Sequence, residues 1–168
     1  VLQTMGYENL GIVVSAMGKT TNDLEDIIYS YQKNDPAYLD LIDHLHHKHE
    51  QIIEGLEMPV EGIEELCLSR FRESGIKKDI KSIMESLKGE MLRNQSRNYS
   101  FLYDQVVSHG ELLSTKIVAA FFNACGIPVL WKDARQLIKT DRKYRDAGVN
   151  WLESEKLIAN SCQGQLFI

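Results

Sequence analysis

Three short polar segments carry the side chains that could do chemistry. Residues 18–22, Gly-Lys-Thr-Thr-Asn, supply hydroxyl groups and one ammonium group, and residues 108–111, Ser-His-Gly-Glu, supply a carboxylate beside a glycine. Residues 132–145 are rich in lysine and arginine. A hydroxyl can hydrogen-bond a carboxylate, and a carboxylate can pair with an ammonium group. The basic segment could bind an anion, although a solvated surface is the more common meaning of such a run.

Gly-Lys-Thr at residues 18–20 follows an apolar run and invites comparison with a phosphate-binding P-loop. That motif needs a glycine five residues before its Gly-Lys pair, so that the backbone amides can fold around a phosphate. The required position is Val13, and Gly11 lies two residues too early. The alternatives are a polar turn that leads into a helix cap, and a ligand-binding loop at a strand end that carries Ser15, Thr20, Thr21 and Asn22.

Four of the five histidines lie at residues 44–49, within a stretch of helical periodicity. Two pairs among them are three residues apart, so each pair could share a divalent metal. His49, however, falls on the apolar stripe of the expected helix. We therefore favour a solvated helix face with one packed histidine, and keep a helical metal-binding or interaction module as the alternative.

Gly110 interrupts an otherwise well-patterned helix. Glycine costs about 1 kcal/mol in a helix interior relative to alanine, so its position indicates that something approaches the backbone there. The alternative is a kink, or a junction between two shorter helices. A Ser-His hydrolase is not favoured, because no Gly-x-Ser-x-Gly segment occurs.

Apolar periodicity predicts the elements that must position these segments. The β-branched run at residues 11–16 predicts a buried strand, followed by a helix capped by Thr21 or Asn22. Residues of about 35–98 predict helices broken near Pro59, Gly62 and Gly75. A long helix is expected from about residue 99 to 124, then a strand at 129–131, a helix at about 150–159 and a strand opening at 165–168. This order suggests a parallel sheet covered by helices.

Composition bounds the classes of function. The 168 residues suit one domain, and a net charge of −5 argues against a general nucleic-acid binder. No apolar run approaches the length of about 18 residues that a membrane helix requires, and no signal peptide opens the chain. Cys67, Cys125 and Cys162 are interpreted as reduced thiols of a cytoplasmic protein. Residues 1–6 resemble the last turn of a helix and residues 165–168 the opening of a strand, so both ends look cut from something larger.

Read together, the polar segments resemble the aspartate kinase family of the amino-acid kinase fold. Residues 13–22, Val-Val-Ser-Ala-Met-Gly-Lys-Thr-Thr-Asn, are similar to the family's second-strand motif, a Val-Ser-Ala segment followed by Thr-Asn. Residues 108–114 resemble its Ser-x-Gly-Glu-x-x-Ser segment, and residues 133–135 and 139–141 resemble its Asp-Ala-Arg and Thr-Asp pair. The motifs lie in the family's order over nearly the whole chain, and the helical stretch between the first two also fits.

The resemblance implies an α/β fold, a parallel-sheet sandwich of the amino-acid kinase type, truncated at both ends. Residues 1–168 would be a partial catalytic domain, its aspartate-binding side, with an all-helical insertion at about 35–98. The implied activity is phosphoryl transfer from MgATP to the β-carboxylate of L-aspartate, giving 4-phospho-L-aspartate, the first step toward lysine, threonine and methionine. ATP and Mg²⁺ would be the cofactors of an intact cytoplasmic homo-oligomer that needs neither nucleic acid nor membrane. Another amino-acid kinase, one that uses glutamate or carbamate, is the alternative.

By resemblance, Thr21 and Glu111 hold the positions that bind aspartate, and Ser15 is a weaker substrate-side candidate. No catalytic residue, cofactor-binding residue or metal ligand is assigned. The family's Lys-Phe-Gly-Gly motif has no counterpart before Val1, and its Thr-Gln-Gly-Phe segment and Gly-Arg-Gly-Gly-Ser-Asp loop would follow Ile168. We therefore expect residues 1–168 alone to be inactive. Gly-Lys-Thr at 18–20 replaces residues that are small in many members, which leaves the role of Lys19 open.

Overall fold

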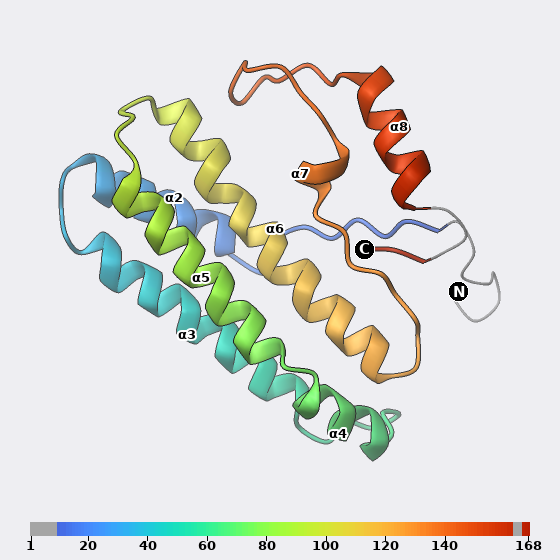
Figure 1. Cartoon of the computed structure of the whole chain (residues 1–168). Coiled ribbons are helices and arrows are strands. Elements are labelled where there is room, and N and C mark those ends of the chain that lie inside the picture. Colours follow the sequence, from blue (N-terminus) through green and yellow to red (C-terminus); the bar gives the residue numbers. More distant parts are fainter. Residues whose placement is uncertain (1–9, 163–165) are drawn as a thin grey trace.

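A computed structural model describes residues 10–162 and 166–168, in which most of the chain is helical (Figure 1). Five helices form a bundle, and two shorter helices lie beside a group of extended segments. The helices are α2 (Thr20–Gln32), α3 (Tyr38–Leu56), α4 (Glu65–Glu73), α5 (Ile76–Arg93), α6 (Tyr99–Ala124), α7 (Ala134–Leu137) and α8 (Trp151–Ser161). No helix of the described residues is long and apolar enough to cross a membrane.

Helix α6 is the central element of the bundle and packs against α2, α4 and α5, while α3 packs against α2 and α5. The apolar stripes predicted from helical periodicity meet in one core, because each helix turns its aliphatic face inward. Its largest fully buried side chains include Leu24, Ile42, Phe71, Ile80 and Leu87. Phe71 of α4 meets Phe121 of α6 edge to face, with ring centroids 5.3 Å apart.

Local signals set most helix boundaries where the sequence predicts them. Asn98 caps α6 by accepting a hydrogen bond from the Phe101 N–H, and Asn150 caps α8 through the Glu153 N–H. Gly75 and Gly126 both have a φ of 77°, the left-handed conformation that ends a helix or joins two helices. Helix α2 differs from the prediction, because it begins at Thr20 and its cap position is Lys19, which makes no side-chain capping bond.

The predicted parallel-sheet sandwich is wrong for the described residues, which contain extended segments but no sheet. Residues 10–14, 129–132 and 166–168 lie side by side, with Phe167 in parallel bridges to both Gly11 and Leu130. The Ile12 N–H donates to the Phe167 carbonyl at 2.9 Å, and the Leu130 N–H donates to the Leu166 carbonyl at 2.9 Å. The pairing is thus parallel, as predicted, but it amounts to isolated bridges.

The extended segments form no sheet because each of them pairs with its neighbour over a very short length. Among the described residues, Phe167 makes one bridge to Gly11 and one to Leu130, and neither pairing extends into a ladder. A strand also needs cover for its faces, and Val13 is 98% exposed. Helices close their hydrogen bonds within one segment, whereas a strand depends on partners far along the chain. The expected start of a strand at Gln165 and the expected helix end at residues 1–6 lie outside the described residues.

The cysteines also differ from the prediction of reduced thiols. Cys67 of α4 and Cys125, which follows α6, form a disulfide between positions 58 residues apart in sequence, with Cα atoms 4.6 Å apart. Cys162 is a free, buried thiol. The sequence spacing of two distant cysteines could not reveal the pair, because only the packing of α4 against α6 brings them together.

Candidate functional site

A cavity of about 330 Å³ lies where α6, α7 and the extended segments meet. It brings together two of the three polar segments identified in the sequence, the Ser-His-Gly-Glu motif on α6 and the Asp-Ala-Arg motif at the start of α7. The cavity is lined by Ile12, Val13, Val14, Ser108, Glu111, Leu112, Thr115, Lys132, Asp133, Ala134, Arg135, Leu137, Phe167 and Ile168. Its wall is largely apolar, with a few charged groups at defined places, which is the usual composition of a small-molecule site.

Glu111 projects from α6 into this cavity and is half-buried. Its Oε1 accepts a hydrogen bond from the backbone N–H of Ala16 at 3.4 Å. Ala16 belongs to the loop between the first extended segment and α2, so this bond joins two segments that are 95 residues apart. The second carboxylate oxygen has no partner among the described hydrogen bonds, and it can accept from a bound ligand.

Gly110 is what allows the loop to lie so close to α6. A Cβ at this position would lie 2.8 Å from the Cβ of Ala16 and 3.3 Å from Thr20 Cγ2 and Leu24 Cδ1. The prediction that something approaches the backbone at Gly110 is therefore confirmed, and the approaching group is the loop that carries the first polar segment. The alternative of a kink or helix junction is not observed, since α6 runs without interruption through Gly110.

The other two predicted substrate residues flank the contact between the loop and α6. Ser15 immediately precedes Ala16 and is exposed, whereas Thr21 is half-buried in the first turn of α2, beside Thr20. The structure brings their segment against Gly110 and Glu111, but neither residue lines the cavity. Thr20, which was not selected as a site residue, is fully buried, and its hydroxyl has no hydrogen-bond partner among the described residues. The roles of Ser15, Thr21 and Glu111 in binding stay predictions.

Asp133 and Arg135 are charged residues that line the same cavity as Glu111. The Arg135 Nε–H donates to Asp133 Oδ1 at 3.0 Å, and a second guanidinium N–H donates to Oδ2 at 2.8 Å. Asp133 also caps α7, because its Oδ1 accepts the Arg135 backbone N–H at 3.0 Å. Burial alone would raise the pKa of Asp133, but the hydrogen bonds and charge of Arg135 outweigh it and lower that pKa. Asp133 is therefore ionised at neutral pH.

Thr115 and Trp131 tie the second extended segment to α6 at the edge of the cavity. The Trp131 indole N–H donates to the Thr115 hydroxyl at 2.9 Å, and that hydroxyl donates to the Glu111 carbonyl at 2.7 Å. The ammonium group of Lys116 lies 3.8 Å from the centroid of the Trp131 ring, within reach of a cation–π contact. This chain of contacts fixes the 131–135 segment relative to the turn of α6 that carries Glu111.

His109 lies behind the cavity rather than in it. It is 1% exposed, its Nδ1 donates to the carbonyl groups of Gln105 and Val106, and its Nε2 lies 3.7 Å from a carboxylate oxygen of Glu90 on α5. Burial lowers its pKa below the ordinary value, although the Glu90 carboxylate acts in the opposite direction. At neutral pH His109 is an uncharged packing residue that joins α5 to α6.

The histidine-rich segment lies on α3, away from the cavity. His49 is fully buried with its Nδ1 bonded to the Leu45 carbonyl, while His47 is exposed and pairs with Glu50. The interpretation as a solvated helix face with one packed histidine is confirmed. Within residues 10–162 and 166–168, no group of three or more His, Cys, Asp or Glu side chains is arranged to hold a metal ion.

The arrangement offers one carboxylate, one locked carboxylate–guanidinium pair and the cation of Lys132 around a small cavity. Such a set can bind a small molecule that carries both positive and negative groups. Sequence reasoning found Glu111 but gave no role to Asp133 and Arg135. The sequence did offer a signal, because Asp133 follows a predicted strand and lies two residues before Arg135. At such a position one carboxylate can both cap a helix and form an ion pair.

Comparison with known proteins relates the chain to one group of enzymes. The bifunctional aspartokinase/homoserine dehydrogenase 1 of Arabidopsis thaliana chloroplasts is 31% identical over 146 residues, which is 86% of this chain and 15% of that relative. The bifunctional aspartokinase/homoserine dehydrogenase 2 of Escherichia coli is 28% identical over 150 residues, 88% of this chain and 17% of that relative. The chain thus spans about one sixth of the curated relatives that it matches. No protein-family model matches the chain.

Two solved structures share the fold. Both are of Escherichia coli aspartokinase III, one in complex with aspartate and ADP and the other in complex with lysine and aspartate. The first superposes with a TM-score of 0.69 and the second with 0.65, at 20% and 21% sequence identity. Each match covers 94% of this chain and 33% of that chain. The likeness extends to the arrangement of helices and extended segments, even though the described residues form no sheet.

Proposed function

The chain belongs to the aspartokinase family, matching one segment of those longer proteins, and we propose that it forms the aspartate-binding side of an aspartate kinase. The complete enzyme would transfer a phosphoryl group from MgATP to the β-carboxylate of L-aspartate and release 4-phospho-L-aspartate and ADP. The observation that carries this proposal is the hydrogen bond between Glu111 and the Ala16 N–H. It joins the two segments on which the family resemblance puts substrate binding.

Glu111 is proposed to pair with the ammonium group of aspartate. Its backbone neighbours hold it from two directions, since Gly110 lets the loop at Ala16 approach and Thr115 bonds the Glu111 carbonyl. A carboxylate fixed in this way loses little conformational freedom on binding, which favours affinity. The complexes of Escherichia coli aspartokinase III with aspartate support aspartate as the substrate class.

The hydroxyl groups of Thr21 and Ser15 are proposed to hydrogen-bond a carboxylate of the substrate. Their segment lies against the turn of α6 that carries Glu111, so an amino acid whose ammonium group meets Glu111 has hydroxyl donors on the neighbouring loop. Phosphoryl transfer depends mainly on the orientation of the acceptor and on charge neutralisation. The proposed task of these three residues is therefore to orient the substrate, with no covalent step.

The phosphate-side chemistry is not assigned to this chain. The relative whose complex contains ADP supports nucleotide use by the complete enzyme. Residues 1–168 contain no counterpart of the family's Lys-Phe-Gly-Gly motif, and we propose that they have no turnover alone and act within a larger homo-oligomeric enzyme.

Replacement of Glu111 by glutamine tests the proposal in the complete enzyme, with ADP release followed as a function of aspartate concentration. Glu111→Gln keeps the shape of the side chain and removes its charge, and we expect the KM for aspartate to rise about 10- to 100-fold or turnover to be lost, as for a charged hydrogen bond worth about 1.5–3 kcal/mol. Glu54→Gln, an exposed glutamate on α3, is the matched control and should leave KM unchanged. Full activity of Glu111→Gln would refute the role of Glu111, and turnover by residues 1–168 alone would refute their inactivity.

A further inference from the structure

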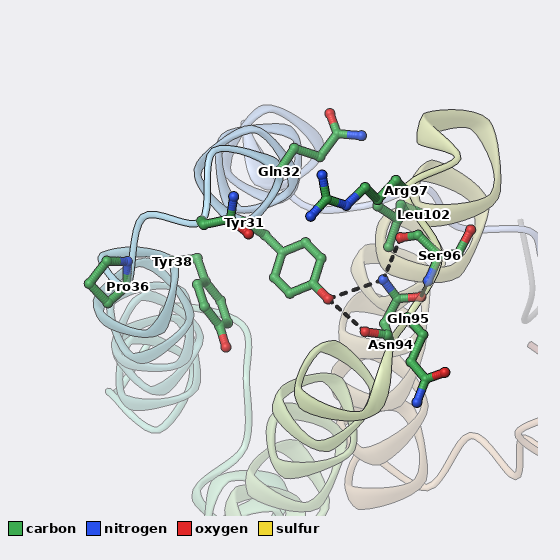
Figure 2. A pocket seen from close by; sticks show the side chains of 10 residues that line it. Tyr31, Gln32, Pro36, Tyr38, Asn94, Gln95, Ser96, Arg97 and Leu102 are labelled. Carbon is green, nitrogen blue, oxygen red and sulfur yellow. Dashed lines mark hydrogen bonds between the residues drawn. The ribbon is translucent and has the colours of Figure 1, made fainter.

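A second and larger cavity, of about 650 Å³, lies at the end of the bundle where α2 leads into α3 and α5 leads into α6 (Figure 2). It is enclosed by the turn that joins α2 to α3 and by the loop that joins α5 to α6, and it shares no lining residue with the cavity at Glu111. Tyr31 and Gln32 at the end of α2 line this cavity, whereas no residue of α2 lines the cavity at Glu111. This volume is within the range of about 300–1,000 Å³ that is typical of small-molecule sites.

The walls of the cavity are fixed by hydrogen bonds within the protein. The Tyr31 hydroxyl donates to the Asn94 carbonyl at 2.9 Å, and the Asn94 amide group donates to the Tyr31 oxygen at 3.2 Å (Figure 2). The same amide group donates to the Ser96 carbonyl at 2.8 Å, while its oxygen accepts the Ser96 N–H at 3.1 Å. The two bonds between Tyr31 and Asn94 join segments that are 63 residues apart, and those to Ser96 fix the α5–α6 loop, so the cavity is formed before any ligand enters. A preformed site avoids the entropy cost of ordering its walls on binding.

The electrostatic character of the cavity is opposite to that of the whole chain. The chain has a net charge of −5, yet no Asp or Glu lines this cavity, and its only charged lining residue is Arg97. Arg97 is exposed and forms no ion pair with a carboxylate of the described residues. Figure 2 shows its guanidinium extending from the α5–α6 loop toward the side of α2, where Tyr31 and Gln32 lie. A planar guanidinium in this setting is suited to bind a carboxylate through two parallel hydrogen bonds.

Aromatic rings form the other side of the cavity. Tyr31 and Tyr38 meet edge to face, with centroids 5.2 Å apart and planes at 90°. Their rings present apolar surface to a ligand, and aromatic groups prefer such edge-to-face or offset arrangements. The carboxamide groups of Gln32 and Gln95 add polar groups at the rim. The lining thus combines one cation with a largely uncharged, partly aromatic surface.

We propose that this cavity is a binding site for a small organic anion, a molecule with one carboxylate and a planar apolar body. Arg97 binds the carboxylate, and the rings of Tyr31 and Tyr38 contact the planar body. An inorganic phosphate is a poorer fit, because a single arginine leaves most of its charge unpaired. A cation is repelled by Arg97. The site is distinct from the aspartate site and does not rest on the proposed function.

The test is calorimetric titration of the protein with 4-hydroxybenzoate as the probe, compared with the uncharged 4-hydroxybenzamide and with inorganic phosphate. We expect saturable binding of 4-hydroxybenzoate, at least about tenfold weaker binding of the amide, and weaker binding of phosphate, because only the benzoate supplies both groups. Arg97→Gln should weaken binding of the benzoate about tenfold or more. Arg142→Gln, which removes the same charge from an exposed arginine outside the cavity, is the matched control and should bind like the unmodified chain.

Tyr38→Leu tests the aromatic contact separately from the charge of Arg97, because it keeps an apolar side chain and removes the ring. It should weaken the benzoate about threefold to tenfold while leaving phosphate binding unaffected. Equal binding of the benzoate and the amide, equal affinity of Arg97→Gln and Arg142→Gln, or absence of saturable binding would overturn the proposal. Tighter binding of phosphate than of the benzoate would identify a simple anion site and would also overturn it.

Discussion

The helical bundle, α2 to α6, and the extended flank, residues 10–14, 129–132 and 166–168, are held together in different ways. Among the described residues, the core of the bundle contains eighteen buried residues from α2 to α6, whereas the core under the extended segments contains four, namely Ala119, Val129, Leu166 and Ile168. The helices of the bundle close their backbone hydrogen bonds internally. The extended segments rely on isolated bridges between residues that are far apart in sequence.

This difference shows how stability and ligand binding are divided within the chain. The cavity that contains Glu111 lies at the boundary between the two regions, with α6 of the bundle on one side and the extended segments on the other. The bundle supplies a rigid position for Glu111, and the less extensively packed flank supplies the loop and the charged residues that line the cavity with it. Functional sites are often found where well-packed and weakly held parts of a protein meet.

The largest expected effect compares one leucine from each region. Leu87→Ala in the bundle should lower the free energy of unfolding by about 3–5 kcal/mol, because the side chain is fully buried and its neighbours cannot close the cavity left behind. Leu166→Ala in the flank should cost about 2 kcal/mol or less, since fewer buried neighbours surround it. Urea denaturation of both variants measures the two losses in the free energy of unfolding. Equal losses would show that the flank is packed as firmly as the bundle.

The disulfide stabilises the bundle but not the extended flank, and its removal should have a somewhat smaller effect on stability than Leu87→Ala. Cys67 and Cys125 both belong to the bundle core, and their bond closes a loop of 58 residues. Its removal by Cys67→Ser should lower the free energy of unfolding by about 2–4 kcal/mol under oxidising conditions, because the unfolded chain gains conformational freedom. Under reducing conditions the unmodified chain should approach the variant. A Cys162→Ser control, at the free thiol, keeps the disulfide and should lose stability on reduction as the unmodified chain does, whereas Cys67→Ser should not respond to the reductant.

Gly110 allows the contact between the two regions to be tested directly. Gly110→Ala should destabilise the protein by about 1–3 kcal/mol, because the new methyl group would overlap Ala16 and the loop would have to move. Gly89→Ala in α5 is the matched control: its methyl group meets only the flexible end of Arg93, and it should stabilise the helix by up to about 1 kcal/mol. In the complete enzyme, Gly110→Ala should also raise the KM for aspartate. Thermal unfolding measures the change in stability of both variants. A loss of stability for Gly110→Ala with a gain for Gly89→Ala would support the close contact, whereas a gain for both would contradict it.

The smallest expected effect is a dependence of stability on pH that arises in the bundle. Burial lowers the pKa of His49 and of His109 below 6.5 in the folded state. The unfolded chain therefore binds more protons than the folded chain as the pH falls below about 6.5, and stability should decrease from pH 7 to pH 5. Asp133 does not contribute in this range, because its pKa is lowered from 3.8.

His49→Leu distinguishes the source of this pH dependence. The variant removes one of the two buried imidazoles, so denaturation curves between pH 5 and 7 should show about half the slope of the unmodified chain. His47→Leu, at an exposed histidine of the same helix, should leave the slope nearly unchanged. The same slope in all three proteins would mean that acid acts on another part of the molecule.

The sequence predicted most of the helices and their ends but not the cysteine pair or the absence of a sheet. The aliphatic stripes of α3 and α5, the glycine at 75 and the polar residue at 150 act through neighbours a few positions away, so a local pattern was enough. The β-branched run at 11–16 predicted a buried strand, which is wrong, because the run has one bridge at Gly11 and Val13 is 98% exposed. Whether such a run becomes a strand depends on partners near residues 130 and 167, which no local pattern reveals.

The candidate site shows the same division between local and distant information. Glu111 and the glycine before it were visible in the sequence, because a glycine and a carboxylate inside an apolar helix conflict with the preferences of that helix. Tertiary structure alone decided that Ala16 would be the group that approaches Gly110, and that Asp133 and Arg135 would line one cavity with Glu111. Helical hydrogen bonds span four residues and can be predicted from sequence, whereas contacts across about 95 residues depend on how the whole chain packs.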